Sequence, residues 1–183
     1  MKKAITIFLM LLLATACSVH AQYAKKNSVE VGGAVSYSST TAVINGSTSG
    51  DPITLLQFAP YAGYFVADQI SIGLSPTVIS FKASGSTTTA YGIYAVPGYT
   101  FTSRGNAFPY VQALLGYTGL STSGSPDLTG FSYGGKAGVK VSVGTGGLID
   151  IGVEYSLITL NPKGADKRNG YNNFAILIGF SVF

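Results

Sequence analysis

The chain has 183 residues and a formal net charge of +4, and only 10% of its residues are charged. Ordinary soluble domains carry about 25% charged residues, so the composition argues against a protein of that class. The excess positive charge is too small to indicate a nucleic-acid partner.

The first 21 residues are predicted to form a cleaved signal peptide. Lys2 and Lys3 precede an apolar run over 4–16, and Val19-His20-Ala21 places small residues three and one positions before a cut. Lipidation at Cys17 is the alternative, although the residue three before a lipidated cysteine is more often Leu than Ala14. Cleavage after Ala21 leaves residues 22–183 as one domain, with a net charge of +2 and neither Cys nor His.

The remaining chain alternates apolar with small or polar residues at period two, which predicts β-strands. The predicted strands cover 27–37, 53–65, 70–82, 90–102, 108–118, 131–143, 148–160 and 171–183. Each is long enough to cross a bilayer, which takes about 9 to 11 tilted residues, whereas no apolar run has the roughly 20 residues of a membrane helix. The fold class is therefore all-β: an eight-stranded, antiparallel, up-and-down transmembrane β-barrel.

The predicted connections alternate in length along the chain. Long ones cover 38–52, 83–89, 119–130 and 161–170, and short ones cover 66–69, 103–107 and 144–147. Outer-membrane barrels have short periplasmic turns and longer outer loops, so both termini are expected in the periplasm. The loops over 38–52 and 119–130 are rich in Ser, Thr and Gly and are expected to be mobile and surface-exposed. Pro60, Pro76 and Pro97 fall inside predicted strands, where bulges are expected to absorb the lost hydrogen bonds.

Aromatic residues gather near the predicted strand ends, as expected of two girdles at the membrane interfaces. The predicted short-turn girdle contains Tyr64, Phe65, Tyr99, Phe101, Phe108, Tyr110 and Phe180. The predicted long-loop girdle contains Tyr37, Phe81, Tyr91, Tyr117, Phe131, Tyr133 and Tyr171.

Three stretches resemble the OmpA- and OmpX-type family of outer membrane β-barrels, in particular its Bacteroidetes-type members. They are the run from Pro60 to Gly73, the Phe108-Pro109-Tyr110-Val111 segment and the terminal Gly179 to Phe183. The resemblance implies a location in the outer membrane of a Gram-negative bacterium, with outer membrane lipids, periplasmic chaperones and the barrel-assembly machinery as partners. It also implies that Phe183 is the assembly signal. Phe183 has the opposite parity to the apolar face of the last strand, so a bulge, the free chain end or an atypical signal must account for it.

Five charged residues occupy the polar positions of the alternating pattern in their strands and are therefore predicted to face the lumen: Glu30, Lys136, Lys140, Asp150 and Glu154. If Gly144-Thr145-Gly146 is a three-residue turn, its register sets Lys140 opposite Asp150 and Lys136 opposite Glu154. Glu30 is expected to join them across the narrow interior. A plug of ion pairs is favoured over a conducting or gating pathway, because unpaired charges there would be costly.

The expected function is that of a non-enzymatic barrel contributing to envelope integrity and to surface interaction or adhesion through its loops. A narrow channel for water, ions or small solutes is the alternative. A lipid-modifying barrel enzyme comes third, because the processed chain has no His for acid–base or Ser-His catalysis. No cofactor, metal or nucleic acid is expected. A soluble lipocalin-type barrel would expose more charge than this chain carries.

Overall fold

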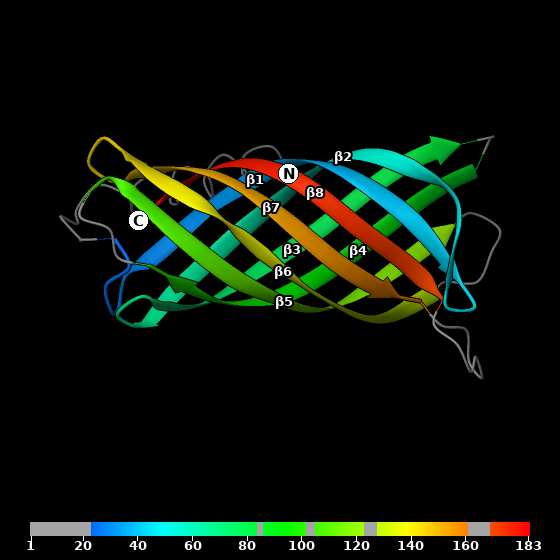
Figure 1. Ribbon diagram of the computed structural model, residues 1–183, viewed down its shortest axis with the longest axis horizontal. Helices are drawn as coiled ribbons and strands as arrows, with labels where there is room; N and C mark the ends of the chain where they lie inside the picture. The colour runs from blue at the N-terminus through cyan, green and yellow to red at the C-terminus, as the bar shows by residue number, and fades with distance from the viewer. Residues whose placement is uncertain (1–22, 84–85, 102–104, 123–127, 161–168) are drawn as a thin grey trace, which may run out of the picture.

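Eight antiparallel strands follow one another along the chain and close into a barrel, because β8 pairs with β1 as well as with β7 (Figure 1). This computed structural model describes residues 23–83, 86–101, 105–122, 128–160 and 169–183. The strands are β1 (Val29–Ile44), β2 (Ser47–Ala67), β3 (Ile70–Ala83), β4 (Ser86–Thr100), β5 (Ala107–Thr122), β6 (Leu128–Val143), β7 (Gly147–Thr159) and β8 (Gly170–Val182). The predicted signal peptide and Cys17 lie outside the described residues, in which there is no helix long and apolar enough to span a membrane. The predicted fold is confirmed.

The two faces of the barrel have the predicted alternation. In β7 the side chains of Ile151 and Val153 are exposed on the outer face, while Asp150 and Ser156 are buried inside. The same alternation holds in β6 and β8, so the outer surface of the barrel is a continuous apolar band. A band of this kind suits contact with lipid.

The β1–β2 connection differs from the prediction. No long loop covers 38–52, because β1 continues to Ile44 and β2 begins at Ser47, with Asn45 and Gly46 between them. Asn45 and Gly46 have φ values of 52° and 82°, which are typical of a two-residue hairpin turn. The Thr and Val residues in this stretch favour strand over loop, and Asn-Gly is itself a hairpin signal. The other strand ends lie within four residues of their predicted positions.

The aromatic girdles are only partly as predicted. Exposed rings include Tyr64, Tyr99, Phe101 and Phe180 toward the short turns, and Tyr37, Tyr91, Tyr117, Phe131 and Tyr133 toward the other end. Phe65, Tyr110 and Tyr171 instead face the lumen, and Phe108 packs against the internal cluster described below. The side chain of Phe81 lies outside the described part of the chain. Parity within the strands, rather than nearness to a strand end, decides which rings face outward.

The bulges expected at the prolines are not where they were predicted. Among the described ladders, the register shifts lie between Thr40 and Ala42 in β1 and between Phe65 and Ala67 in β2. The β3–β4 ladder runs without a shift through both Pro76 and Pro97.

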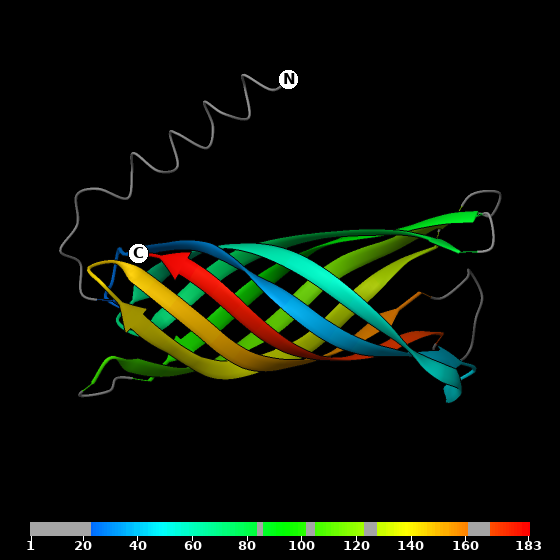
Figure 2. The same ribbon diagram turned by 90° about the horizontal axis from the view of Figure 1, so that it is seen from above.

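The ladder between β2 and β3 instead ends near the middle of both strands, at Ala62 and Leu74. Continuing this register would bring Pro60 opposite Pro76, and proline has no backbone N–H to donate. The hydroxyl of Ser75 donates to the carbonyl oxygen of Pro60 at 2.9 Å across this junction. Beyond it the two strands diverge, and the far ends of the β1–β2 and β3–β4 hairpins lie well apart (Figures 1 and 2).

Candidate functional site in the barrel lumen

The predicted register of β6 and β7 is correct. Val143 lies opposite Gly147 across a three-residue turn in which Gly144 has a φ of 67°. The Cα partners of Lys140 and Lys136 are then Asp150 and Glu154, as the turn requires. All five predicted lumen charges face the interior.

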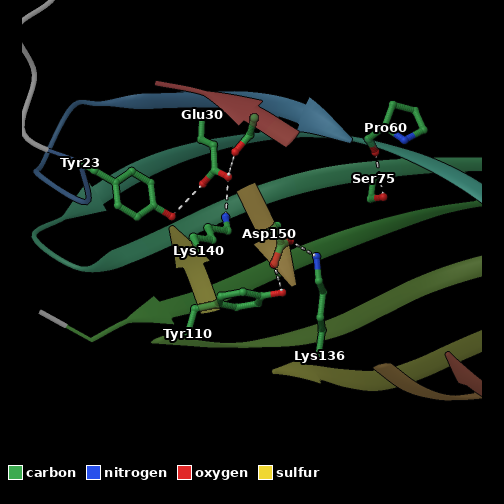
Figure 3. A network of polar contacts seen from close by, with 9 residues as sticks. Tyr23, Glu30, Pro60, Ser75, Tyr110, Lys136, Lys140 and Asp150 are labelled. Atoms are coloured by element: carbon green, nitrogen blue, oxygen red, sulfur yellow. Dashed lines mark hydrogen bonds and ion pairs between the residues drawn. The ribbon is translucent and has the colours of Figure 1, made fainter. Parts of the chain in front are cut away.

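The ion pairs, however, do not follow the cross-strand register. The ammonium group of Lys140 lies 2.5 Å from Oε1 of Glu30 on β1, across the lumen. The ammonium group of Lys136 lies 2.9 Å from Oδ2 of Asp150, which is four residues along β7 from the cross-strand partner Glu154 (Figure 3). The predicted Lys140–Asp150 and Lys136–Glu154 contacts are therefore wrong in partner, because a long lysine side chain in a narrow barrel reaches past its cross-strand neighbour.

Three further donors complete the network. The hydroxyl of Tyr23 donates to Oε2 of Glu30 at 3.1 Å, and that of Ser181 donates to Oε1 at 2.7 Å. The hydroxyl of Tyr110 donates to Oδ1 of Asp150 at 2.8 Å. Glu30 is only 2% exposed and is held by three groups, which largely offsets the cost of burying its charge.

Aromatic rings surround the lysines. The ammonium group of Lys140 lies 5.1 Å from the ring centroid of Tyr110 and 5.4 Å from that of Tyr61. The Tyr61 ring is accommodated by Gly63 and Gly73, because a Cβ atom there would lie 2.7 Å and 2.8 Å from its Cζ atom. These two glycines therefore make room for a bulky ring inside the barrel.

The short-turn end of the lumen is closed by an aromatic cluster. Tyr23, which precedes β1, packs its ring 5.5 Å from Phe65, 5.0 Å from Phe108 and 5.1 Å from Phe183. Leu148 is fully buried in the same cluster. Phe183 thus lies on the inner side, as its parity requires, without a bulge in β8, and its role as an assembly signal remains a prediction.

Hydrogen bonds attach the N-terminal segment to the β2–β3 turn at the short-turn end of the barrel. The amide of Gln69 donates to the carbonyl oxygen of Ala24 at 2.8 Å, and the amide of Lys26 donates to Oδ1 of Asp68 at 2.9 Å. This hydrogen bond and the ammonium group of Lys25, 3.3 Å away, hold the pKa of the exposed Asp68 carboxyl below its usual value. Burial raises the pKa of the Tyr23 hydroxyl, so it stays a proton donor to Glu30.

Around the plug there remains a cavity of only about 60 Å³, lined by all five predicted charges. Glu154 lies in this cavity too, although the ion pairs between described residues of the lumen join the lysines to Glu30 and Asp150. The described residues contain no cluster of His, Cys, Asp or Glu arranged to hold a metal ion. Parity could have identified Tyr61 and Tyr110 as inward-facing, whereas no sequence signal placed Tyr23 in the lumen.

Comparison with solved structures identifies the same architecture in several membrane proteins. The Neisserial surface protein A superimposes with a TM-score of 0.69 at 20% identity, covering 84% of this chain and 96% of that protein. OprG from Pseudomonas aeruginosa has a TM-score of 0.54 at 14% identity, covering 88% and 98%. AlkL in lipid bilayers has a TM-score of 0.53 at 13% identity, covering 90% and 93%.

No protein-family model matches the sequence, and comparison with curated proteins finds no match. The structural likenesses establish the fold, which is the eight-stranded β-barrel of these membrane proteins. The Bacteroidetes-type relationship remains a prediction from the sequence.

Proposed function

We propose that this protein is a closed, non-enzymatic barrel of the Gram-negative outer membrane that supports envelope integrity and presents a surface for binding. We infer the closed lumen from the plug that the Lys140–Glu30 pair forms above the Tyr23 cluster. A lumen filled in this way is expected to block a hydrated ion, and this supports the closed barrel over the alternative of a narrow channel. Export through a signal peptide cut after Ala21 and insertion by the barrel-assembly machinery belong to the same proposal.

The surface for binding is the projecting end of the β1–β2 hairpin. A strand needs about 9 to 11 residues to cross the membrane, whereas β1 has 16 residues and β2 has 21. All residues over 44–54 are exposed, and they lie at the end of the barrel opposite Tyr23. With the termini in the periplasm, this hairpin extends beyond the outer surface of the membrane. Ail of Yersinia pestis, which has the same fold with a TM-score of 0.50, is named as an attachment protein, which favours a role in surface interaction.

The two parts of the proposal are separable by experiment. A variant with residues 41–52 replaced by a minimal Asn-Gly turn joins the cross-strand partners Thr40 and Ile53, keeps the membrane-spanning barrel and removes most of the projecting hairpin. Intact cells carrying either form are cross-linked, and the proteins captured at the surface are compared. Partners captured by the parent alone support the binding role, whereas identical sets from both forms contradict it. Rescue of detergent sensitivity in a deletion strain by both forms supports the structural role of the barrel, and failure of the parent to rescue contradicts that role.

The evidence against an enzyme is chemical. Among the described residues, the buried polar side chains of the lumen are charged groups, hydroxyls and the amides of Gln112 and Asn173, without histidine. Analysis of lipid A by mass spectrometry in cells with and without the protein tests this part of the proposal, because a modified lipid would contradict it.

A further inference from the structure

The outer half of the lumen, away from Tyr23, contains a second and larger cavity. Its volume is about 400 Å³, which falls in the range of small-molecule binding sites. Apolar side chains make up much of its wall, among them Ile53, Leu55, Leu114, Leu120, Ile158 and Leu160. Water in contact with such walls is displaced favourably by an apolar molecule.

One charged residue lies among the described residues that line this cavity. It is Glu154, which stands near the hydroxyl of Ser156 and the amide of Asn173 on the wall. Among the described residues the lumen contains three carboxylates and two lysines, so one negative charge is in excess. Lys136 is the cross-strand neighbour of Glu154, but its ammonium group makes its ion pair with Asp150, and Lys140 makes its ion pair with Glu30. The cavity therefore combines apolar walls with a carboxylate whose charge a cationic group would balance.

The backbone hydrogen bonding in the wall of this cavity is interrupted on one side. The β2–β3 ladder ends at Ala62 and Leu74, and lumen-facing residues on both sides of the gap, such as Gln57 and Thr77, line the cavity. Six residues at a rise of about 3.3 Å and a tilt of about 40° place the end of the ladder about 15 Å above the β2–β3 turn. That depth is near the middle of the bilayer, so the interruption faces the hydrocarbon of the outer leaflet.

We propose that this cavity binds a small alkyl amine or similar apolar molecule with a cationic end, which enters from the bilayer between β2 and β3. The apolar body fills the space between Leu55, Leu114 and Ile158, and the cationic group pairs with Glu154. The site lies on the outer side of the plug and shares Glu154 with the smaller plug cavity.

Photolabelling in lipid nanodiscs tests this inference, with octan-1-amine carrying a terminal diazirine as the probe. The parent is expected to form adducts at cavity residues of β4, β5 and β7, mapped by mass spectrometry. Octan-1-ol with the same diazirine should label these sites less, and Glu154→Gln should remove the difference. Adducts confined to the outer face of the barrel would overturn the proposal, and equal labelling by amine and alcohol in the parent would overturn the role of Glu154.

A matched pair of variants distinguishes the effect of filling the cavity from the effect of adding a bulky ring anywhere on the strand. Ala90→Phe places a ring in the cavity, and Ala95→Phe places the same ring on the outer face of the same strand. A ring that excludes two methylene groups of the probe weakens binding about tenfold, so cavity adducts should fall by that factor in Ala90→Phe alone. Both variants are first required to migrate on gels as the parent does, with different mobilities before and after boiling, which shows that the barrel has folded. Undiminished labelling of folded Ala90→Phe would contradict the site.

The route is tested by closing the gap from the lipid side. Phe58 and Val78 are exposed and occupy opposite positions if the β2–β3 register is continued. Joining Phe58→Cys and Val78→Cys with a short bis-maleimide is expected to slow cavity labelling by the membrane-dissolved amine, relative to the same variant left unjoined. Equal rates in the two samples would overturn entry between β2 and β3.

Discussion

Removal of the Lys140 ammonium group is the most informative perturbation of the lumen. Lys140 is 3% exposed and lies 2.5 Å from Glu30, which is 2% exposed. Breaking a buried pair from one side typically costs about 3 to 5 kcal/mol, because the remaining charge is left without its partner. Tyr23 and Ser181 still donate to Glu30, so we expect Lys140→Met to lower the free energy of unfolding by about 3 kcal/mol, at the lower end of that range.

The assay is urea unfolding from lipid vesicles, arranged as double-mutant cycles. The cycle between Lys140 and Glu30 should give a coupling of about 1 to 3 kcal/mol, and the cycle between Lys136 and Asp150 should give a similar value. The exposed Lys25–Asp68 pair serves as the control and should give a much smaller coupling. Additive effects for Lys140 and Glu30, together with strong coupling of Lys140 to Asp150, would refute the partner assignment.

Three further predictions concern the outer face, the N-terminal segment and the hairpin turn. Val153→Arg, on the lipid face near the middle of β7, should destabilise the inserted barrel by about 2 to 4 kcal/mol, and equal tolerance at Val153 and at the inward-facing Ser156 would show that the faces are reversed. The lowered pKa of Asp68 means that its contribution is complete above the usual carboxyl pKa and lost as pH falls through the lowered value, so the protection factor of the Lys26 amide, its intrinsic exchange rate divided by the observed rate, should fall on acidification. Asp68→Asn removes the titrating group, so this protection factor should not change with pH in that variant, and a pH response that persists would contradict the assignment. Gly46→Val forces a β-branched residue to a φ of 82° and should cost about 1 to 3 kcal/mol in the same urea assay, whereas an unchanged stability would contradict the turn.

The alternation of side chains along each strand was sufficient to predict the fold and the face on which each lumen charge lies. Period-two patterning is a local property, and a three-residue turn fixes the pairing of its two strands, so the β6–β7 register followed from Gly144 and Gly146. The choice of ion-pair partner did not follow, because Lys140 reaches Glu30 across the closed barrel. That contact depends on the diameter of the barrel and the stagger of its strands, which local patterning does not contain.

The β1–β2 hairpin and the position of Tyr23 were not predicted from the sequence. The stretch over 38–52 is rich in Ser and Thr, yet its strands are stabilised by pairing with each other around Asn45 and Gly46. The position of Tyr23 depends on tertiary packing, because its ring fills a space made by Phe65, Phe108 and Phe183 from three different parts of the chain. Residues ahead of the first strand carry no periodicity from which such a position can be read.

Planar-bilayer recording is the most direct test of the central claim, that the lumen is closed by the plug. The folded parent protein is expected to give no conductance steps, because the Lys140–Glu30 pair and the Tyr23 cluster fill the lumen. Tyr23→Ala combined with Lys140→Ala and Glu30→Ala opens the same path and serves as the positive comparison, with measurable steps expected if it inserts as a folded barrel. Reproducible conductance of the parent, at the level of the opened variant, would contradict the closed barrel and favour the channel.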